Sequence, residues 1–335
     1  MAFWLPLLIC LVLLLAPVGG PAFAKRISAP FYAEHGAWLL ACDNTRRCTA
    51  RGLDTTNNAA IQISRDAGDA PIIITLAVPT PEKFPVPPLV RLAGRVLILG
   101  SPDWKTHAAE WITTITTAAP RAVRALLAAD RNARTLALSG GYVIPLDDLA
   151  GVLREMGAIQ DRAGSLNPPI RPRWRRPAGL SRSEAAVLIA SVHRWAAGLL
   201  LGTGCAERPT LEHDAAYALD ARRAVVLLAC PYNSYQGETF AFIVPRAGGV
   251  PAPFTPHVPV LGTLREPLGD ETFDPATGVL TSRQRGAGLA NCGTRAAWVW
   301  SAGAFRLVSL THQAACSGPF ADDWPVLFRT APYRH

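Results

Sequence analysis

Hydrophobic residues along this chain recur in short runs with the two-residue period of β-strands. Residues 60–65 alternate apolar and polar side chains, which predicts a strand with one buried face. Residues 72–78 form a continuous β-branched run, which is typical of a central strand. A polar turn between Cys42 and Cys48 separates two apolar runs and predicts a hairpin. Further short strands are expected at residues 95–99, 136–138 and 142–144.

Helical patterns are fewer. Residues 108–118 and 121–129 are predicted to be helical, with a break at Pro120. Asp147 or Asp148 can cap a helix whose core face is formed by the apolar residues Leu149, Val152, Leu153, Met156 and Ile159. Ser181 and Glu184 form a capping-box pattern that opens a helix ending near residue 197.

The second half of the chain contains two similar hairpin patterns, which suggests a related β unit used twice. A tight turn at Ala302-Gly303 would pair Trp300 with Phe305 and Trp298 with Leu307. The same register in the first hairpin would pair Tyr217 with Val226 and Leu219 with Ala224. Strands at residues 239–244 and 279–282, the latter preceded by a turn at 274–278, are expected to complete an antiparallel meander.

These elements predict an α+β fold that is mostly antiparallel β, with two β-rich lobes and a few amphipathic helices in the amino-terminal lobe and the connection. The expected segments are a signal peptide (1–24), an amino-terminal lobe (25–165), a linker and helix (166–198) and a carboxy-terminal lobe (199–335). The linker is rich in proline and arginine. Arg171, Arg173, Arg175 and Arg176 around Trp174 could engage an anionic polymer or lipid surface, but an extended linker with one docked tryptophan is the favoured interpretation.

The amino-terminal apolar segment and the cysteines indicate export. The segment ends in Ala22-Phe23-Ala24, a cleavage pattern of secretory signal peptides, and its apolar run is too short to span a bilayer. Removing it takes away Cys10 and leaves six of the seven cysteines. The simplest pairing, one of the 15 that six cysteines permit, is between neighbours. It gives the disulfides Cys42–Cys48, Cys205–Cys230 and Cys292–Cys316.

Charge and composition narrow the partners only slightly. The net charge is +8, and arginine supplies most of it without forming a long basic run. A basic surface favours anionic partners in the cell envelope, although general solubility is the simpler explanation. Candidate partners are therefore an anionic envelope component or a secreted protein. Neither nucleic acid nor a stable membrane span after signal cleavage is expected.

Catalytic motifs are not found in the sequence. It lacks the G-x-S-x-G, H-E-x-x-H, P-loop, S-x-x-K and Rossmann patterns, and its histidines are scattered. Glu212-His213-Asp214 invites a metal or acid–base interpretation, but adjacent strand residues point to opposite faces. Asp270, Glu271 and Asp274 are explained as well by a turn as by a calcium site. We therefore predict no catalytic residue, no metal ligand and no cofactor.

Two groups of residues have both a binding and a structural interpretation. Asp43, Asn44 and Arg46 could form a recognition loop on the disulfide-closed turn, but turn chemistry accounts for the same residue types and is favoured. Trp298, Trp300 and Trp324 could form a sugar-stacking platform, whereas cross-strand pairing favours a place in the core.

Several motifs together resemble one known family. They are CDNTRRCTARG at residues 42–52, preceded by Trp38, CPYN at residues 230–233, and the closing pattern Gly288, Asn291-Cys292-Gly293, Trp298, Trp300, Phe305, Leu307, Cys316, Gly318 and Trp324. With them the chain resembles a family of uncharacterised secreted bacterial proteins known only as a domain of unknown function, DUF1176. The resemblance covers almost the whole mature chain and implies export. The family has no established activity, so it offers no catalytic residues to carry across to this chain. This chain has Gln160-Asp161-Arg162 where the family usually has Gln-Gly-Arg.

These observations favour an exported, disulfide-stabilised protein of the periplasm or cell exterior. The leading hypothesis is a non-catalytic protein that binds an envelope component or acts as an inhibitor. The alternative is a secreted hydrolase whose site is assembled from sequence-distant residues. A pocket with converging acid, base and amide groups would favour the hydrolase.

Overall fold

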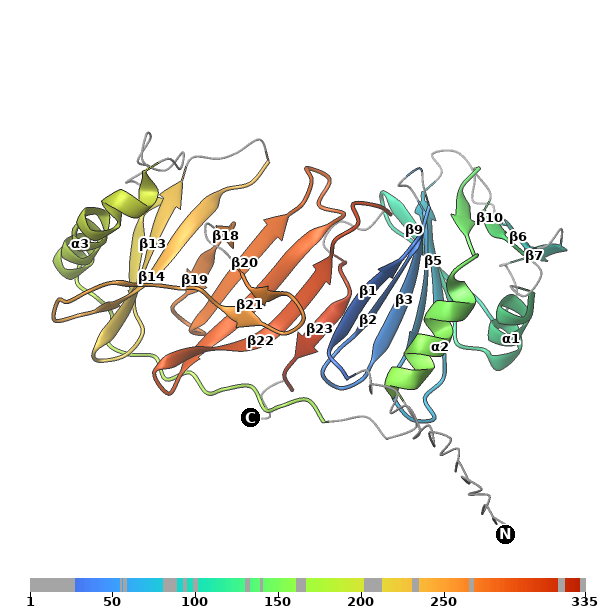
Figure 1. The fold of residues 1–335 in the computed structure, drawn as a ribbon, viewed down its shortest axis with the longest axis horizontal. Coiled ribbons are helices and arrows are strands. Elements are labelled where there is room, and N and C mark those ends of the chain that lie inside the picture. Colours follow the sequence, from blue (N-terminus) through green and yellow to red (C-terminus); the bar gives the residue numbers. More distant parts are fainter. Residues whose placement is uncertain are drawn as a thin grey trace, which may run out of the picture.

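Two β-rich lobes lie side by side in an elongated molecule (Figure 1). The computed structural model describes residues 28–54, 56, 59–80, 89–92, 95–98, 102–129, 133–138, 141–160, 167–201, 213–230, 235–264, 268–318 and 323–331, without the side chains of 89–98. The predicted signal peptide (1–24), Cys10 and Cys205 lie outside the described residues. The mostly antiparallel β fold predicted from the sequence is confirmed.

The amino-terminal lobe is built on a seven-stranded antiparallel sheet in the order β1-β2-β3-β4-β5-β9-β8. Strand β2 is buried along its whole length. One of its faces packs into the lobe's own core, while Ala41 on the other face belongs to the core of the carboxy-terminal lobe. The strands are β1 (Phe31–His35), β2 (Trp38–Cys42), β3 (Cys48–Leu53), β4 (Ala60–Arg65), β5 (Ile73–Pro79), β8 (Lys105–Ala108) and β9 (Ile112–Thr117).

A second, four-stranded sheet and two helices complete this lobe. Helix α2 (Leu149–Gln160) lies across the large sheet, as Figure 1 shows, and buries the predicted apolar positions except Leu153, which is half-buried. The buried apolar residues of α2 belong to the same core cluster as Leu126 of helix α1 (Pro120–Ala129). The second sheet has the order β11-β10-β6-β7, with β6 (Leu89–Leu92), β7 (Arg95–Ile98), β10 (Thr135–Leu138) and β11 (Val143–Pro145).

The prediction of a helix over residues 108–118 is wrong. This segment contributes the end of β8 and all of β9, which pairs with β5. Strand β9 has the sequence ITTITT, whose β-branched side chains favour a pleated surface, and the hydroxyls of Thr116 and Thr75 lie 3.1 Å apart across the pair. Pro120 begins helix α1 rather than breaking one, because the first helical position needs no N–H donor.

The carboxy-terminal lobe contains three antiparallel groups of strands. The five-stranded sheet at the outer end has the order β12-β13-β14-β15, with β18 pairing to β14; β19 to β23 form a second sheet in sequence order, and β16 pairs with β17. The strands are β12 (Ala215–Ala218), β13 (Arg223–Cys230), β14 (Glu238–Pro245), β15 (Ala252–Pro253), β16 (His257–Val258), β17 (Gly262–Thr263), β18 (Leu268–Gly269), β19 (Thr272–Asp274), β20 (Val279–Arg285), β21 (Gly293–Ser301), β22 (Ala304–Gln313) and β23 (Val326–Arg329).

Helix α3 (Arg182–Leu200) covers one face of the outer sheet (Figure 1). Its predicted capping box between Ser181 and Glu184 is present. The buried residues of the helix recur every four positions and pack on β13 and β14. They are Leu188, Val192, Ala196 and Leu200. No helix among the described residues is long and apolar enough to cross a membrane.

The register predicted for the second hairpin is confirmed, and that of the first hairpin is wrong by one residue. Trp300 pairs with Phe305 across a turn in which Ala302 and Gly303 both have positive φ, as this short turn requires. Tyr217, by contrast, pairs with Val225. The first turn is longer because the carboxylate of Asp220 accepts hydrogen bonds from two backbone N–H groups at its end, those of Arg222 and Arg223.

The proline-rich linker is tied to the carboxy-terminal lobe through its tryptophan. The Trp174 ring packs edge-on against Phe273 at 6.1 Å, within the core cluster of that lobe. The ring also covers Gly278, where a Cβ atom would lie 2.1 Å from it. This contact supports the docked-tryptophan interpretation of the linker.

Candidate functional site

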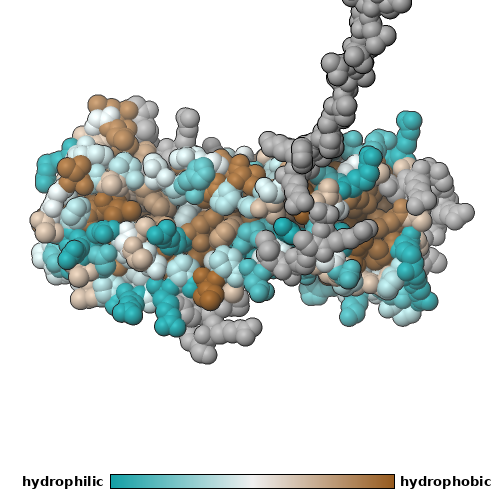
Figure 2. Space-filling model, turned by 60° about the horizontal axis from the view of Figure 1, so that its bottom comes forward, coloured by the Kyte–Doolittle hydropathy of each residue, from teal (hydrophilic) through white to brown (hydrophobic). Residues whose placement is uncertain are grey.

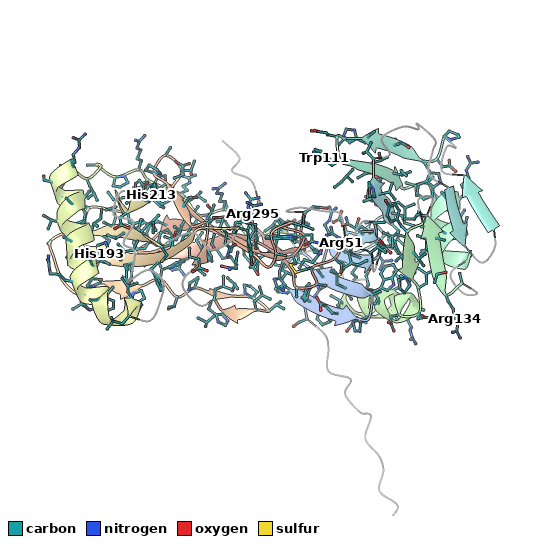
Figure 3. The ribbon with its side chains drawn as sticks, turned by 90° about the horizontal axis from the view of Figure 1, so that it is seen from above. Arg51, Trp111, Arg134, His193, His213 and Arg295 are labelled. Carbon is teal, nitrogen blue, oxygen red and sulfur yellow. A yellow bond between two sulfur atoms is a disulfide. The ribbon has the colours of Figure 1, made fainter. Side chains whose placement is uncertain are left out.

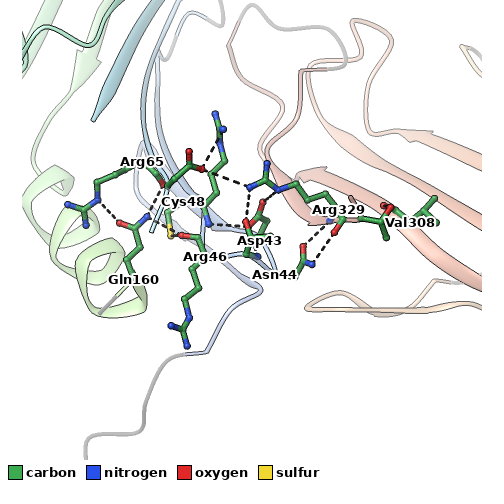
Figure 4. A network of polar contacts seen from close by, with 12 residues as sticks. Asp43, Asn44, Arg46, Cys48, Arg65, Gln160, Val308 and Arg329 are labelled. Atoms are coloured by element: carbon green, nitrogen blue, oxygen red, sulfur yellow. Dashed lines mark hydrogen bonds and ion pairs between the residues drawn. The ribbon is translucent and has the colours of Figure 1, made fainter. Parts of the chain in front are cut away.

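The disulfide-closed turn, for which a recognition role and a structural role were both considered, lies at the junction of the two lobes. The Cys42–Cys48 disulfide closes the turn, and the buried carboxylate of Asp43 organises it. Asp43 Oδ1 accepts hydrogen bonds from Thr45 N (2.7 Å), Thr45 Oγ1 (2.7 Å) and Arg47 N (3.0 Å). Asp43 Oδ2 forms an ion pair of 2.7 Å with Nε of Arg329 from β23 (Figure 4). The acid therefore both shapes the turn and connects it to the other lobe.

Asn44 strengthens the same junction, while the Arg46 side chain takes no part in it. The Asn44 amide exchanges two hydrogen bonds with the backbone of Arg329, at 3.0 and 2.9 Å. Arg46 has φ of 65° and points away from the network in Figure 4. Of the three loop residues, Asp43 and Asn44 thus have structural partners, whereas no hydrogen bond or ion pair joins the Arg46 guanidinium to the described part of the chain.

Gln160, at the end of α2, holds the other side of this turn. Its amide nitrogen donates to the carbonyl oxygens of Arg46 (3.1 Å) and Arg65 (2.8 Å), and its oxygen accepts from Arg65 Nε at 2.7 Å. The side chain is buried and every polar atom is used. Gln160 stands at the Gln-Gly-Arg position noted in the sequence, and that resemblance was the only signal pointing to it.

Arg51, which the sequence did not single out, is a second contact between the lobes. Its side chain is only 1% exposed. Its guanidinium donates to Gln62 Oε1 (2.6 Å) within the sheet and to Gln313 Oε1 (2.8 Å) and the Asp323 carbonyl (2.7 Å) of the other lobe. Burial lowers the pKa of Arg51, and the ion pair with Asp323 at 3.1 Å opposes that shift.

The disulfides predicted between Cys42 and Cys48 and between Cys292 and Cys316 are present. Cys230 is also disulfide-bonded, and its predicted partner Cys205 lies outside the described residues. The loop closed by Cys292–Cys316 contacts β1, where the backbone N–H of Ala314 donates to Tyr32 Oη at 3.0 Å. Burial raises the pKa of this Tyr32 hydroxyl.

An aromatic groove opens in the carboxy-terminal lobe between β14–β15 and the β21–β22 hairpin. Its volume is about 330 Å³. Trp298 and Trp300 are only 2% and 4% exposed, so they are core residues, as favoured from the sequence. They also form part of the groove wall. Phe305 lies 5.1 Å from the Trp300 ring and is only partly buried. Trp324 is buried elsewhere and donates to the Ala290 carbonyl. Figure 2 shows several hydrophobic patches on the surface of this lobe, at the left.

The polar lining of the groove is sparse and contains one permanent charge. Arg223 lies with its guanidinium carbon 5.4 Å from the centre of the Trp300 ring and donates through Nη1 to the Gly303 carbonyl. Thr255 and His257 are the other polar lining side chains, and no acidic residue lines the groove among the described residues. The site therefore combines an aromatic wall with a cation.

A histidine and an aspartate are in contact near residue 213, but the histidine is His193 and not the His213 that is adjacent to Asp214 in the sequence. His193 Nε2 of α3 lies 2.6 Å from Asp214 Oδ2, while Oδ1 accepts from Ala229 N at 2.9 Å. Figure 3 shows His193 on the outer helix, near His213. Glu212 lies outside the described residues. No cluster of three or more metal-ligating side chains occurs within the described ranges.

Asp270 and Asp274, two of the acids for which a calcium site was considered, have partners within the protein. Asp270 forms an ion pair with Arg285 at 3.1 Å and accepts from Gly237 N at 2.8 Å. Asp274 accepts from Ala276 N and Thr277 Oγ1 within its own turn, and these bonds lower its pKa. The turn interpretation therefore accounts for Asp274.

Fold and site together define a two-lobed antiparallel β protein fastened by disulfides, with an aromatic groove in one lobe. A family model described as protein of unknown function (DUF1176) matches residues 32–172 and 167–331, so the chain belongs to this family. It is also 26% identical over 332 residues to the uncharacterized protein YpfG of Escherichia coli (strain K12), covering 90% of this chain and 94% of that protein. No solved structure matches the chain.

Proposed function

We propose that this protein is an exported, non-catalytic binding protein and that its ligand site is the aromatic groove. The observation that carries the proposal is the groove's composition. A pocket of about 330 Å³ with aromatic walls and a few polar groups has the size and character of a small-molecule site. Its described lining contains no carboxylate, serine or cysteine, and its one hydroxyl is that of Thr255. His257 Nδ1 lies 3.5 Å from Thr263 Oγ1 rather than at a lining nucleophile that it could activate as a base. This composition favours binding over hydrolysis.

Binding is tested with 2-naphthamide, a flat apolar molecule without charge, by calorimetric titration. Ala252→Trp places a large ring at an exposed lining position and is expected to abolish binding. Val250→Trp is the matched control, because Val250 is 73% exposed, lies two residues earlier and does not line the groove. No saturable binding to the wild-type protein, or equal binding by both variants, would contradict the proposed site.

Export rests on the apolar amino-terminal segment and on the disulfides, which persist in oxidising compartments. The test is the intact mass of the protein recovered without reductant from the cell envelope or medium. We expect a chain that starts at Lys25 and is lighter by two hydrogens for each disulfide. A full-length chain with free thiols would refute export.

The hydrolase alternative has one observation in its favour, the His193–Asp214 pair. A buried carboxylate that orients an imidazole is a recurring part of acyl-transfer sites. No hydroxyl or thiol of the described residues hydrogen-bonds to His193, and such a site also needs a nucleophile. Loss of an ester-hydrolysing activity in a His193→Gln variant would support the alternative.

A further inference from the structure

We propose that the ligand of the aromatic groove is a flat, apolar molecule with one carboxylate, and that Arg223 binds this carboxylate. The inference rests on the proposed binding function and adds the chemical class of the ligand. It is carried by a half-buried cation inside an aromatic site, which forms no ion pair with any acidic side chain that the structure describes.

The guanidinium of Arg223 has no ion-pair partner among the described residues. Within the same residues its contacts are a hydrogen bond to the carbonyl of Gly303 and a ring contact with Trp300. Asp220, at the same turn, uses Oδ1 to accept from the backbone N–H of Arg223 and Oδ2 to accept from Trp300 Nε1 at 3.1 Å.

The unused N–H groups of Arg223 suit a carboxylate. A guanidinium has five N–H donors in one plane, and a carboxylate can accept two of them in parallel. The contacts with Gly303 and Trp300 hold the side chain at the groove before any ligand arrives, which reduces the entropy lost on binding. A low-dielectric aromatic surrounding strengthens the attraction between the two charges.

The walls of the groove define the rest of the ligand. Phe305 and Leu307 of β22 line it and are only partly buried, so they offer apolar surface that the protein itself leaves uncovered. Phe254 meets both Trp298 (5.2 Å) and Phe305 (5.1 Å) edge to face, which fixes the orientation of the rings. A flat apolar body can stack on this surface while its acidic group reaches Arg223.

The test compares 2-naphthoate with 2-naphthamide, which have the same ring system and differ in charge. We expect the wild-type protein to bind naphthoate at least about tenfold more tightly, as a charge-assisted hydrogen bond predicts. Arg223→Gln should abolish this preference while naphthamide still binds, which shows that the variant retains a folded groove. Arg306→Gln is the matched control, since Arg306 carries the same charge but is exposed and does not line the groove.

Each outcome has a separate meaning for the two proposals. Equal binding of naphthoate and naphthamide, unaffected by Arg223→Gln, would overturn the carboxylate inference and leave the groove as a binding site. An equal loss of preference in Arg306→Gln would show a long-range charge effect and would also overturn it. Binding of neither probe would refute the proposed function itself.

Discussion

Removing the carboxylate of Asp43 tests whether the disulfide-closed turn is a structural junction. Asp43→Ala deletes the acceptor of three hydrogen bonds from Thr45 and Arg47 and the ion-pair partner of Arg329. Asp43→Asn keeps a side-chain oxygen in the place of Oδ1 but puts an NH2 group, which cannot accept a hydrogen bond, in the place of Oδ2, so it removes the ion pair with Arg329. The two variants therefore separate the hydrogen bonds from the ion pair.

The magnitude follows from burial. Leaving a buried hydrogen-bond donor unpaired costs about 1–3 kcal/mol, and Asp43→Ala removes the acceptor of three donors on Thr45 and Arg47. The Arg329 side chain is 39% exposed, so water can replace part of its lost interaction and the ion pair itself contributes about 1 kcal/mol. We therefore expect Asp43→Asn to lower the free energy of unfolding by about 1 kcal/mol, and Asp43→Ala to lower it by about 3 kcal/mol.

The assay is urea unfolding followed by tryptophan fluorescence, with the disulfides intact. Asp66→Ala is the control, because Asp66 lies 3.9 Å from the same Arg329 but is 50% exposed; its expected cost is within about 0.5 kcal/mol. If Asp43→Ala were no more destabilising than Asp66→Ala, the turn would not be a structural junction, and its role as a recognition loop would gain support.

Three further predictions concern other contacts. Gly278→Ala should lower the free energy of unfolding by about 2–3 kcal/mol, because φ is +66° there and the new Cβ would displace Trp174; additivity with Trp174→Ala in a double-mutant cycle would contradict that contact. Arg51→Met should cost about 2–4 kcal/mol by leaving buried amide oxygens unpaired, whereas Arg47→Met, at an exposed ion pair, should cost less than about 0.5 kcal/mol in the same urea assay. Burial lowers the pKa of His312, so the unfolded chain binds a proton first as the pH falls below about 6.5, and the free energy of unfolding should decrease there. Urea unfolding at pH 7.5 and 5.5 should show this decrease. An equal decrease in a His312→Gln variant would refute the role of His312.

Several features of the fold could be predicted because they depend on neighbouring residues. The Ser181 and Glu184 capping box lies within one turn of chain, and the Ala302-Gly303 turn determines the register of its hairpin. The segment at residues 108–118 shows the limit of such reasoning. Its strand is stabilised by pairing with β5, and only the folded sheet supplies that partner.

The sequence by itself determined the β-rich class, most of the strands and two disulfides between cysteines that are neighbours in the sequence. The period of the hydrophobic residues, the residue types of the turns and the spacing of the cysteines are all local properties. Only the tertiary structure decided what the polar and aromatic residues do. Asn44 contacts Arg329 across 285 positions, and Arg223 reaches Trp300 from a different sheet. The physical reason is that a side chain's partner, burial and uncompensated charge depend on which distant segments the folded chain brings together.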